Sequence, residues 1–424
     1  MKKAGVAILG MGVVGGGTYK ILVDRKQAIM DEYGVEVEVK AVLDKIPARV
    51  TAAGADLSLL AGSIDEIVAR DDIDIVVECM GGVEPAKTFL IKALSAGKSI
   101  VTSNKEMFAK SWPELEAAAA PTGAGLYYEA TTGGGMPIIR VMTAAMQANR
   151  ILEIKAIING TTNYILTRMA QEGLDYAEIL KDAQALGYAE ANPVADVEGF
   201  DSGYKLSILA SLAFNKRVPV DLIYREGITP ITSVHIEQAD KLGYVIKLLA
   251  IAKNGNNGKI EARVHPVFLP KDHPLANVNG SFNAVFLVGD AVGDIMLYGR
   301  GAGDLPTGSA IVSDIVYCAR QIEHARYSEM NESMTQKDIN SDFMSRYYLR
   351  LNVHNVAGVV ADIANVFKKY KVSIAQMRQE EGKEVISIVF VTHLTNEKAM
   401  NKSVEEISRL ANVISVENVI RVER

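Results

Sequence analysis

The 424-residue chain is poor in cysteine, with Cys79 and Cys318 as its only two. Two thiols are too few for a disulfide framework or a cysteine metal site, so we expect the protein to work in the reducing cytoplasm. The six histidines have no metal-ligand spacing, which disfavours transition-metal catalysis. No apolar run approaches the roughly 20 residues of a membrane span, so a membrane partner is not expected.

Basic residues are not in excess, because 45 Lys and Arg stand against 51 Asp and Glu. The net charge of -6 disfavours nucleic acid or an anionic membrane surface as the main partner. A chain of this length is expected to form two or three domains with ample core. The bulk composition is therefore that of an ordinary soluble globular protein.

Strands alternate with helices over the first third of the chain. The strand-like segments lie at 5–9, 35–43, 73–77, 99–101 and 126–129, with helical segments between them. This order predicts an α/β domain with a Rossmann-type, doubly wound parallel sheet. The ligand crevice of such a sheet lies beyond the carboxyl ends of its strands, so functional residues should follow strand ends.

The pattern changes near residue 150, where we predict an inserted α+β domain. Its helices are expected at 164–171, 176–185, 202–214 and 236–252, and its strands at 151–158, 260–268, 284–288 and 294–298. Further on, a helical stretch at 307–326 is expected to pack on the first domain, and the polar segment 328–345 is expected to be a linker. The βαββαβ order of the remaining residues predicts a ferredoxin-like plait.

The hexapeptide GMGVVG, residues 10–15, fits the G-x-G-x-x-G pattern of dinucleotide-binding proteins. Gly10 permits the tight turn, Gly12 lets backbone approach a pyrophosphate, and Gly15 allows close packing of helix on strand. The pattern alone is weak, but here it follows a predicted strand and opens a helix whose free N–H groups favour phosphate. We therefore predict dinucleotide binding.

The end of the second strand bears on the choice of nicotinamide cofactor. Asp44 favours a free ribose 2′-hydroxyl, as in NAD, whereas Lys45 and Arg49 favour the 2′-phosphate of NADP. Since both kinds of side chain are present, the sequence predicts NAD or NADP without choosing between them.

Three further turns follow predicted strands. VTSNKEMFA, residues 101–109, places Lys105 at the crevice, where it is either a surface lysine or a group that binds a substrate oxygen or transfers a proton. YYEATTGGGMPIIR, residues 127–140, has three glycines that suit close backbone approach to a ligand or a hinge. NGTTNYIL, residues 159–166, suits a helix cap as well as a binding loop.

The stretch GYAEANPVADVEGFDSGYK, residues 187–205, gathers acidic side chains and a lysine just before an apolar helix. Asp201 and Lys205 stand four residues apart and therefore share a helix face. A Lys and an Asp that enter an apolar interior are either paired or placed there for chemistry. The alternative is an ordinary helical ion pair, worth about 0.2–0.5 kcal/mol.

Taken together, GMGVVG, TSNKEMFA, EATTGGGMP, NGTTN, GYAEANPVADVEGFDSGYK and GAGDLPTGSAIVSDI resemble the homoserine dehydrogenase family in wording, order and spacing. The resemblance implies interconversion of L-aspartate 4-semialdehyde and L-homoserine with NAD(P)H, a step toward threonine, methionine and isoleucine. It implies that Lys105 and Lys205 flank the aldehyde oxygen. It also implies that Glu190, Asp196 and Asp201 hold the substrate, chiefly by its ammonium group. Two lysines agree with the chemistry, because a developing alkoxide needs a nearby cation and proton donor.

The same resemblance implies the remaining ligand positions. The cofactor would be bound by Gly10, Gly12, Val13, Val14, Gly15, Ser103, Lys105 and Gly303. A monovalent cation, Na⁺ or K⁺, would be bound mostly through the backbone carbonyls of Glu129, Thr132, Gly134 and Met136. Many members carry an Arg for the 2′-phosphate where this chain has Leu43, so strict NADP preference is not implied.

The last 78 residues, 347–424, resemble an ACT domain, a small regulatory plait that binds amino acids. This implies threonine as an effector and side-by-side pairing into a homodimer or homotetramer. The usual Pro-Gly before the first helix is Ala357–Gly358 here, so threonine binding is inferred from architecture only.

Two alternatives remain. The first is another ACT-bearing dehydrogenase, acting on 2-hydroxy acids or prephenate. The 2-hydroxy-acid enzymes of this kind use a catalytic histidine, and no suitable histidine lies beside a motif in this chain. A non-catalytic sensor of NAD(P) and an amino acid would not need both Lys105 and Lys205.

These assignments give the predicted domain boundaries. They are 1–135 for the NAD(P)-binding domain, completed by a returning helix at about 305–326, then 136–304 for the catalytic and dimerisation domain, 327–346 for the linker and 347–424 for the ACT domain.

Overall fold

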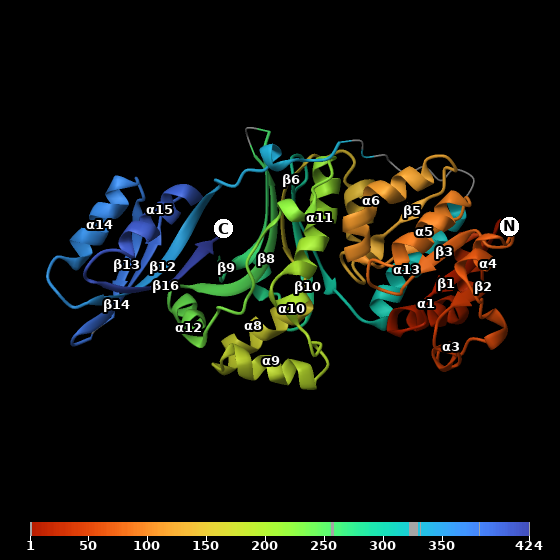
Figure 1. Ribbon diagram of the computed structural model, residues 1–424, viewed down its shortest axis with the longest axis horizontal. Coiled ribbons are helices and arrows are strands. Elements are labelled where there is room, and N and C mark those ends of the chain that lie inside the picture. The colour runs from red at the N-terminus through yellow and green to blue at the C-terminus, as the bar shows by residue number, and fades with distance from the viewer. Residues whose placement is uncertain (1, 256–257, 322–329, 331, 381, 424) are drawn as a thin grey trace.

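The computed structural model describes residues 2–255, 258–321, 330, 332–380 and 382–423, which form three consecutive parts (Figure 1). The N-terminal part and the C-terminal plait lie at opposite ends of the molecule, and the inserted domain lies between them. This arrangement confirms the predicted combination of a parallel α/β sheet, an α+β domain and a βαββαβ plait. No helix within these ranges combines the length and the apolar character that crossing a bilayer demands.

The N-terminal sheet has five parallel strands in the order β2-β1-β3-β4-β5. Alternate side chains of a strand point to opposite faces, and a parallel sheet is covered on both. Val6 and Ile8 accordingly lie in one core, whereas Ala7 and Leu9 lie in the other. The strands are β1 Lys2–Leu9, β2 Val35–Leu43, β3 Ile75–Glu78, β4 Ser99–Thr102 and β5 Leu126–Tyr127.

Helices of this part are α1 Val13–Asp24, α2 Lys26–Tyr33, α3 Pro47–Ala52, α4 Ile64–Val68, α5 Ala86–Ser95 and α6 Lys105–Ala119. Helix α6 begins at Lys105 rather than near Pro113 as the sequence predicted, because Asn104 caps it by accepting the Met107 N–H at 3.1 Å. Helix α13, Asp304–Gln321, returns from the middle of the molecule and buries Ile311 beside Ile8, as predicted. The predicted end of this helix lies outside the described residues.

The middle part is built on an antiparallel sheet in the order β11-β10-β6-β8-β9. Its strands are β6 Ile151–Ile157, β8 Tyr244–Asn254, β9 Ile260–Pro270, β10 Phe282–Gly289 and β11 Gly293–Arg300, with the short β7 Tyr224–Arg225 beside β9. The helices are α7 Ile138–Arg140, α8 Gly160–Glu172, α9 Tyr176–Ala185, α10 Val194–Val197, α11 Phe200–Phe214 and α12 Ser233–Lys241.

One predicted helix is wrong. The sequence predicted a single helix over 236–252, but α12 ends at Lys241, the chain turns at Gly243, and β8 begins at Tyr244. Strand β8 lies between β6 and β9, and its residues 246–252 are buried on both faces. A strand buried on both faces has an unbroken apolar run, which periodicity cannot distinguish from a buried helix.

The C-terminal plait is joined to the middle sheet. Its elements are β12 Met344–His354, α14 Val359–Lys369, β13 Ile374–Gln379, β14 Val385–Thr392, β15 Thr395–Asn396, α15 Glu397–Ile407 and β16 Val413–Val422. Strand β16 pairs antiparallel with β12, and its last residues, Arg421 and Val422, pair parallel with β9. The two sheets therefore form one continuous sheet of 11 strands, a junction that the sequence did not predict.

Candidate active site

A cavity of about 380 Å³ opens where the strands of the N-terminal sheet end. Its lining comes from the turns after β1, β3, β4 and β5, from α11 and from the segment before α13. Among the lining residues are Val14, Ser103, Lys105, Lys205 and Gly303. The cavity therefore lies where the sequence predicted a ligand crevice, and it brings together residues far apart in the chain.

The glycine-rich turn has the geometry that a bound phosphate needs. Gly10 has a φ of +92°, and a Cβ at Gly15 would stand 1.9 Å from the Gly10 carbonyl oxygen, so both positions require glycine. Beyond its own neighbours in the chain, no atom of the described residues lies within 4 Å of the place where a Cβ at Gly12 would stand. Helix α1 begins at the next residue, and no side chain caps it. The open space before free helical N–H groups fits a pyrophosphate.

The second strand ends beside this turn. Asp44 accepts the Met11 N–H at 2.6 Å and the Ile46 N–H at 2.8 Å, so its carboxylate is fixed next to the turn. Lys45 and Arg49 are exposed nearby. The structure therefore keeps both the acidic and the basic candidates for contact with the ribose, as the sequence did.

Helix α11 brings Asp201 and Lys205 together at the cavity. Both side chains are buried, and Lys205 Nζ donates to Asp201 Oδ2 at 2.7 Å and to the Ile158 carbonyl at 2.7 Å. Lys105 Nζ, from the start of α6, lies 3.1 Å from the other carboxylate oxygen, Oδ1. One carboxylate is thus held between two lysines that come from different domains.

Asn159 connects this cluster to a second carboxylate. Its Oδ1 caps α8 by accepting the Thr162 N–H at 2.8 Å, and its Nδ2 donates to Asp196 at 2.7 Å and Asp201 at 2.9 Å. The sequence left a helix cap and a binding loop open for this turn, and the structure confirms the cap and shows Asn159 bonded to two carboxylates of the site. Glu190 lies on the surface nearby, and its charge contributes to raising the pKa of Lys105.

The two lysines differ in their acidity. Burial alone would raise the pKa of Asp201, but Lys205 and Lys105 hold it well below its usual value. Burial lowers the pKa of Lys205, and Asp201 opposes this shift without offsetting it. The Asp201 carboxylate raises the pKa of Lys105, whose side chain is 41% exposed. Of the two lysines, only Lys205 therefore has a pKa shifted down toward neutrality.

Comparison with known proteins agrees with this geometry. The family model for the homoserine dehydrogenase NAD-binding domain matches residues 10–129, the homoserine dehydrogenase model matches 137–316, and the ACT domain model matches 347–412. A homoserine dehydrogenase from Mycobacterium tuberculosis is 41% identical, over 100% of this chain and 98% of that protein. The chain belongs to the homoserine dehydrogenase family.

Solved structures of this family have the same fold. A homoserine dehydrogenase from Thiobacillus denitrificans superposes with a TM-score of 0.93 at 38% identity, over 100% of this chain and 99% of that one. A hyperthermophilic archaeal homoserine dehydrogenase in complex with NADPH has a TM-score of 0.65 at 26% identity, over 78% of this chain and 100% of that one. The protein is accordingly an oxidoreductase with a nicotinamide-binding domain and an ACT domain.

Ala130, Thr131, Thr132 and Gly134, in the segment after β5, line the cavity. The Glu129 carboxylate accepts hydrogen bonds from the Ile139 and Arg140 N–H groups, at 2.7 and 2.8 Å. The buried Thr132 hydroxyl has no hydrogen-bond partner within the described ranges. The Met136 carbonyl accepts one N–H, which leaves a second lone pair. Both the hydroxyl and the carbonyl are neutral oxygens. In the described part of the chain, no group of three His, Cys, Asp or Glu side chains is placed to hold a metal ion.

The cavity also contains residues that the sequence analysis missed. Gly81 and Gly82 follow β3 and line it, and Glu78, buried at the end of that strand, accepts the Met80 and Gly81 N–H groups at 2.7 and 3.1 Å. Asn104 Nδ2 donates to the Gly82 carbonyl at 2.6 Å. The sequence did offer a signal for these residues, because Gly81 and Gly82 come shortly after a buried strand at the crevice end of the sheet.

Proposed function

We propose that this protein reduces L-aspartate 4-semialdehyde to L-homoserine, reversibly, with Lys205 and Lys105 on the carbonyl oxygen. The observation that carries the proposal is the buried Asp201 carboxylate between Lys205 and Lys105 at the cavity. The nicotinamide cofactor supplies or accepts the hydride. As negative charge develops on the carbonyl oxygen, the two ammonium groups stabilise it. Lys205, with its lowered pKa, donates the proton and accepts it in the reverse direction.

The acidic side chains have a separate role in the proposal. Asp196, Asp201 and Glu190 bind the ammonium group of the amino-acid substrate. Burial raises the pKa of Asp196, although Asn159 and the lysines act in the opposite direction. Asp201 stays ionised because both lysines stabilise its charged form. A substrate ammonium adds a further cation to this acidic side of the site, which favours its binding.

The proposed cofactor contacts come from the glycine-rich turn and the cavity wall. They are Gly10, Gly12, Val13, Val14, Gly15, Ser103, Lys105 and Gly303. The turn suits either NAD or NADP, and the presence of both Asp44 and the exposed Lys45 and Arg49 after β2 leaves both within the proposal. The proposed monovalent cation, Na⁺ or K⁺, is bound by oxygens of Glu129, Thr132, Gly134 and Met136, supported by the unpartnered Thr132 hydroxyl.

The ACT domain supports regulation by an amino acid, for which we propose threonine. We further propose a cytoplasmic homodimer or homotetramer. The predicted domain boundaries, 1–135 with the returning helix, 136–304 and 347–424, stay part of this proposal.

Steady-state kinetics test the proposal directly. The full chain, under reducing conditions with K⁺ or Na⁺, should oxidise NADH or NADPH when L-aspartate 4-semialdehyde is added. Absence of activity with either cofactor would refute it and favour the alternative of a non-catalytic sensor. Activity on a 2-hydroxy acid instead would favour the alternative dehydrogenase.

A further inference from the structure

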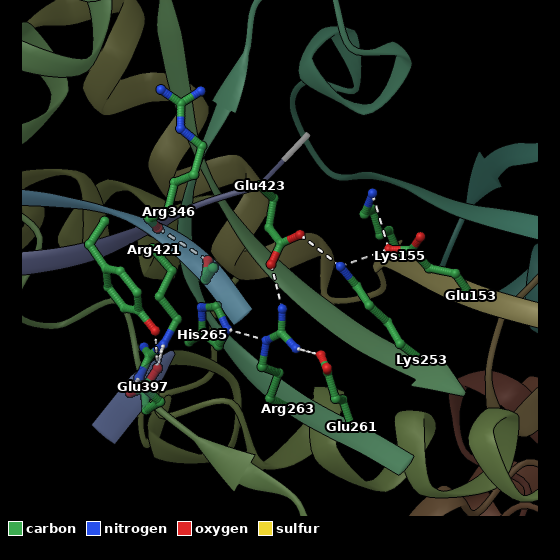
Figure 2. Close-up of polar contacts among 12 residues, drawn as sticks. Glu153, Lys155, Lys253, Glu261, Arg263, His265, Arg346, Glu397, Arg421 and Glu423 are labelled. Atoms are coloured by element: carbon green, nitrogen blue, oxygen red, sulfur yellow. Dashed lines mark hydrogen bonds and ion pairs between the residues drawn. The ribbon is translucent and has the colours of Figure 1, made fainter. Parts of the chain in front are cut away.

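The junction between the ACT domain and the catalytic domain contains a buried arginine on the last strand. Arg421 Nη2 and Nε donate to the two carboxylate oxygens of Glu397, on α15, at 2.5 and 3.1 Å. Its remaining terminal nitrogen, Nη1, donates to Glu226 Oε1 at 2.9 Å. Only 7% of the Arg421 side chain is exposed. Figure 2 shows Arg421 beside Glu397. A side chain fixed within the ACT domain thus reaches across to the catalytic domain.

Glu226 belongs to a short segment, residues 224–229, which we call the bridging segment. Its first two residues form β7, which pairs with β9. The Glu226 N–H donates to the Val264 carbonyl of β9 at 2.8 Å, and the Tyr224 hydroxyl also bonds to the Glu226 carboxylate. The guanidinium of Arg421 lies 5.1 Å from the centre of the Tyr224 ring. The ACT domain therefore contacts this segment through both a carboxylate and a ring.

The other side of the bridging segment packs on the turn that joins α10 to α11. The Ile228 N–H donates to the Val197 carbonyl at 2.8 Å, and the Thr229 hydroxyl donates to Glu198 at 2.9 Å. A Cβ at Gly227 would stand 2.5 Å from the same Val197 carbonyl oxygen, so the two backbones are in direct contact. Contacts this close transmit displacement, since protein interiors are close-packed.

The contacted turn sits between the two carboxylates of the active site. Asp196 immediately precedes Val197, and Asp201 immediately follows Phe200. The guanidinium of Arg225, also in the bridging segment, lies 4.6 Å from the centre of the Phe200 ring. Both ends of the turn are therefore held from the bridging segment, and catalysis tolerates only small displacements of substrate-binding groups.

We propose that Arg421 and Glu226 are positioning residues, which set the placement of Asp196 and Asp201 through the bridging segment. The ACT domain thereby completes the substrate site of its own chain without touching substrate. This inference rests on the proposed function, because it assigns those two carboxylates to the substrate ammonium group.

The same strand offers a matched control. Glu423, two residues after Arg421, accepts from Arg263 at 2.5 Å and lies 3.1 Å from Lys253, which also pairs with Glu153 (Figure 2). These partners come from β6, β8 and β9, and none belongs to the bridging segment. Glu423→Gln therefore weakens the attachment of the ACT domain without removing a side-chain contact of the bridging segment, whose link to Arg263 is the strand pairing of Tyr224.

The test compares Glu226→Ala with Glu423→Gln in the full chain. Glu226 is 38% exposed, and its loss leaves Arg421 paired with Glu397, so the variant is expected to fold. For Glu226→Ala, the KM for homoserine should rise about three- to thirtyfold, the range seen for couplings of this kind. The cofactor KM should change less than about twofold, because the displaced carboxylates bind substrate and not cofactor. Glu226→Gln, which keeps an acceptor for Arg421, should restore most of the wild-type KM.

Three results would overturn the inference: an unchanged homoserine KM in Glu226→Ala, an equal rise in Glu423→Gln, or an equal rise in the cofactor KM. A parallel Asp196→Asn variant separates this failure from failure of the proposed function. If Asp196→Asn leaves the homoserine KM unchanged in an active enzyme, the carboxylate assignment itself is wrong. If it raises that KM while Glu226→Ala does not, only the positioning role is wrong.

Discussion

Replacing Lys205 by methionine removes the buried ammonium group from the proposed reaction centre and keeps most of the side-chain volume. The ammonium has three N–H donors, and the described residues provide two acceptors, Asp201 and the Ile158 carbonyl. One donor is thus left for a substrate oxygen. Asp201 keeps its contacts with Lys105, at 3.1 Å, and with Asn159, at 2.9 Å. The variant should therefore fold with its carboxylate still paired.

The size of the effect follows from what Lys205 does and what Lys105 retains. Loss of a general acid lowers rates by about 10²- to 10⁴-fold, and loss of one oxyanion donor by about 10²- to 10³-fold. Lys105 remains as a cation beside the site, although its side chain is 41% exposed and so partly screened. We expect kcat for the reduction to fall about 10³-fold, or about 4 kcal/mol of transition-state stabilisation.

The assay is NAD(P)H oxidation under saturating substrate, with cofactor binding measured separately by fluorescence titration. Lys247→Met provides the matched control, because Lys247 is also a buried lysine of the middle domain but donates to Asn163, Asn279 and the Val278 carbonyl, away from the cavity. The control should keep kcat within about threefold, as expected for a site outside the chemistry. Retention of more than about a tenth of the rate by Lys205→Met would contradict the general-acid role.

The pH profile gives an independent check of the same assignment. Reduction needs Lys205 protonated, so its rate should fall as pH rises through a pKa that burial has moved below the usual lysine value. Homoserine oxidation needs the neutral amine, so its rate should rise over the same window. Both limbs should disappear in Lys205→Met. If either rate still changes with pH in Lys205→Met, the titrating group is a residue other than Lys205.

Three other predictions concern stability and ligands. Burial lowers the pKa of Lys247 from 10.5 to about 8. Between these two pH values the unfolded state binds more protons than the folded state, so the free energy of unfolding should rise with pH by about 3 kcal/mol. In denaturation experiments, Lys247→Met should flatten this rise relative to wild type. Thr132→Val should raise the K⁺ or Na⁺ concentration needed for half-maximal activity about tenfold, whereas an unchanged value would remove the hydroxyl from the cation site. Threonine should bind the full chain at millimolar concentration or below in titration calorimetry, and no heat of binding would contradict its role as effector.

Local patterns in the sequence were enough to predict most elements and the pairing of Asp201 with Lys205. They failed where two elements have the same local appearance, as at β8, whose mostly apolar residues 246–252 were predicted to be helical. They also left open contacts made across the fold. Asn159 caps α8 as the sequence allowed, but its second role depends on Asp196 and Asp201, which follow about forty residues later, at separations of 37 and 42. Side-chain contacts at such separations follow from packing, which local propensity does not encode.

The junction between β16 and β9 shows the same limit more strongly. Arg421 and Glu226 are 195 residues apart, and each lies in a segment that is ordinary for its local sequence. Burial of charged groups costs several kcal/mol per ion, and well-packed apolar residues can be equally stable in their place. Stability alone therefore gives no reason for a buried arginine at this junction. A requirement for one defined placement of the ACT domain gives such a reason, because directional hydrogen bonds fix a geometry that apolar packing leaves less specific.

The cluster around Asp201 follows the same reasoning within one helix. Helix α11 is apolar through most of its length, yet its first turns bury Asp201 and Lys205. Burial lowers the pKa of Lys205, and the Asp201 carboxylate opposes this shift. Because Asp201 also pairs with Lys105, neither lysine receives the full stabilisation of an exclusive pair. An exclusive pair would hold Lys205 protonated and unreactive. In the proposed mechanism, sharing one carboxylate between two lysines therefore leaves Lys205 able to exchange a proton.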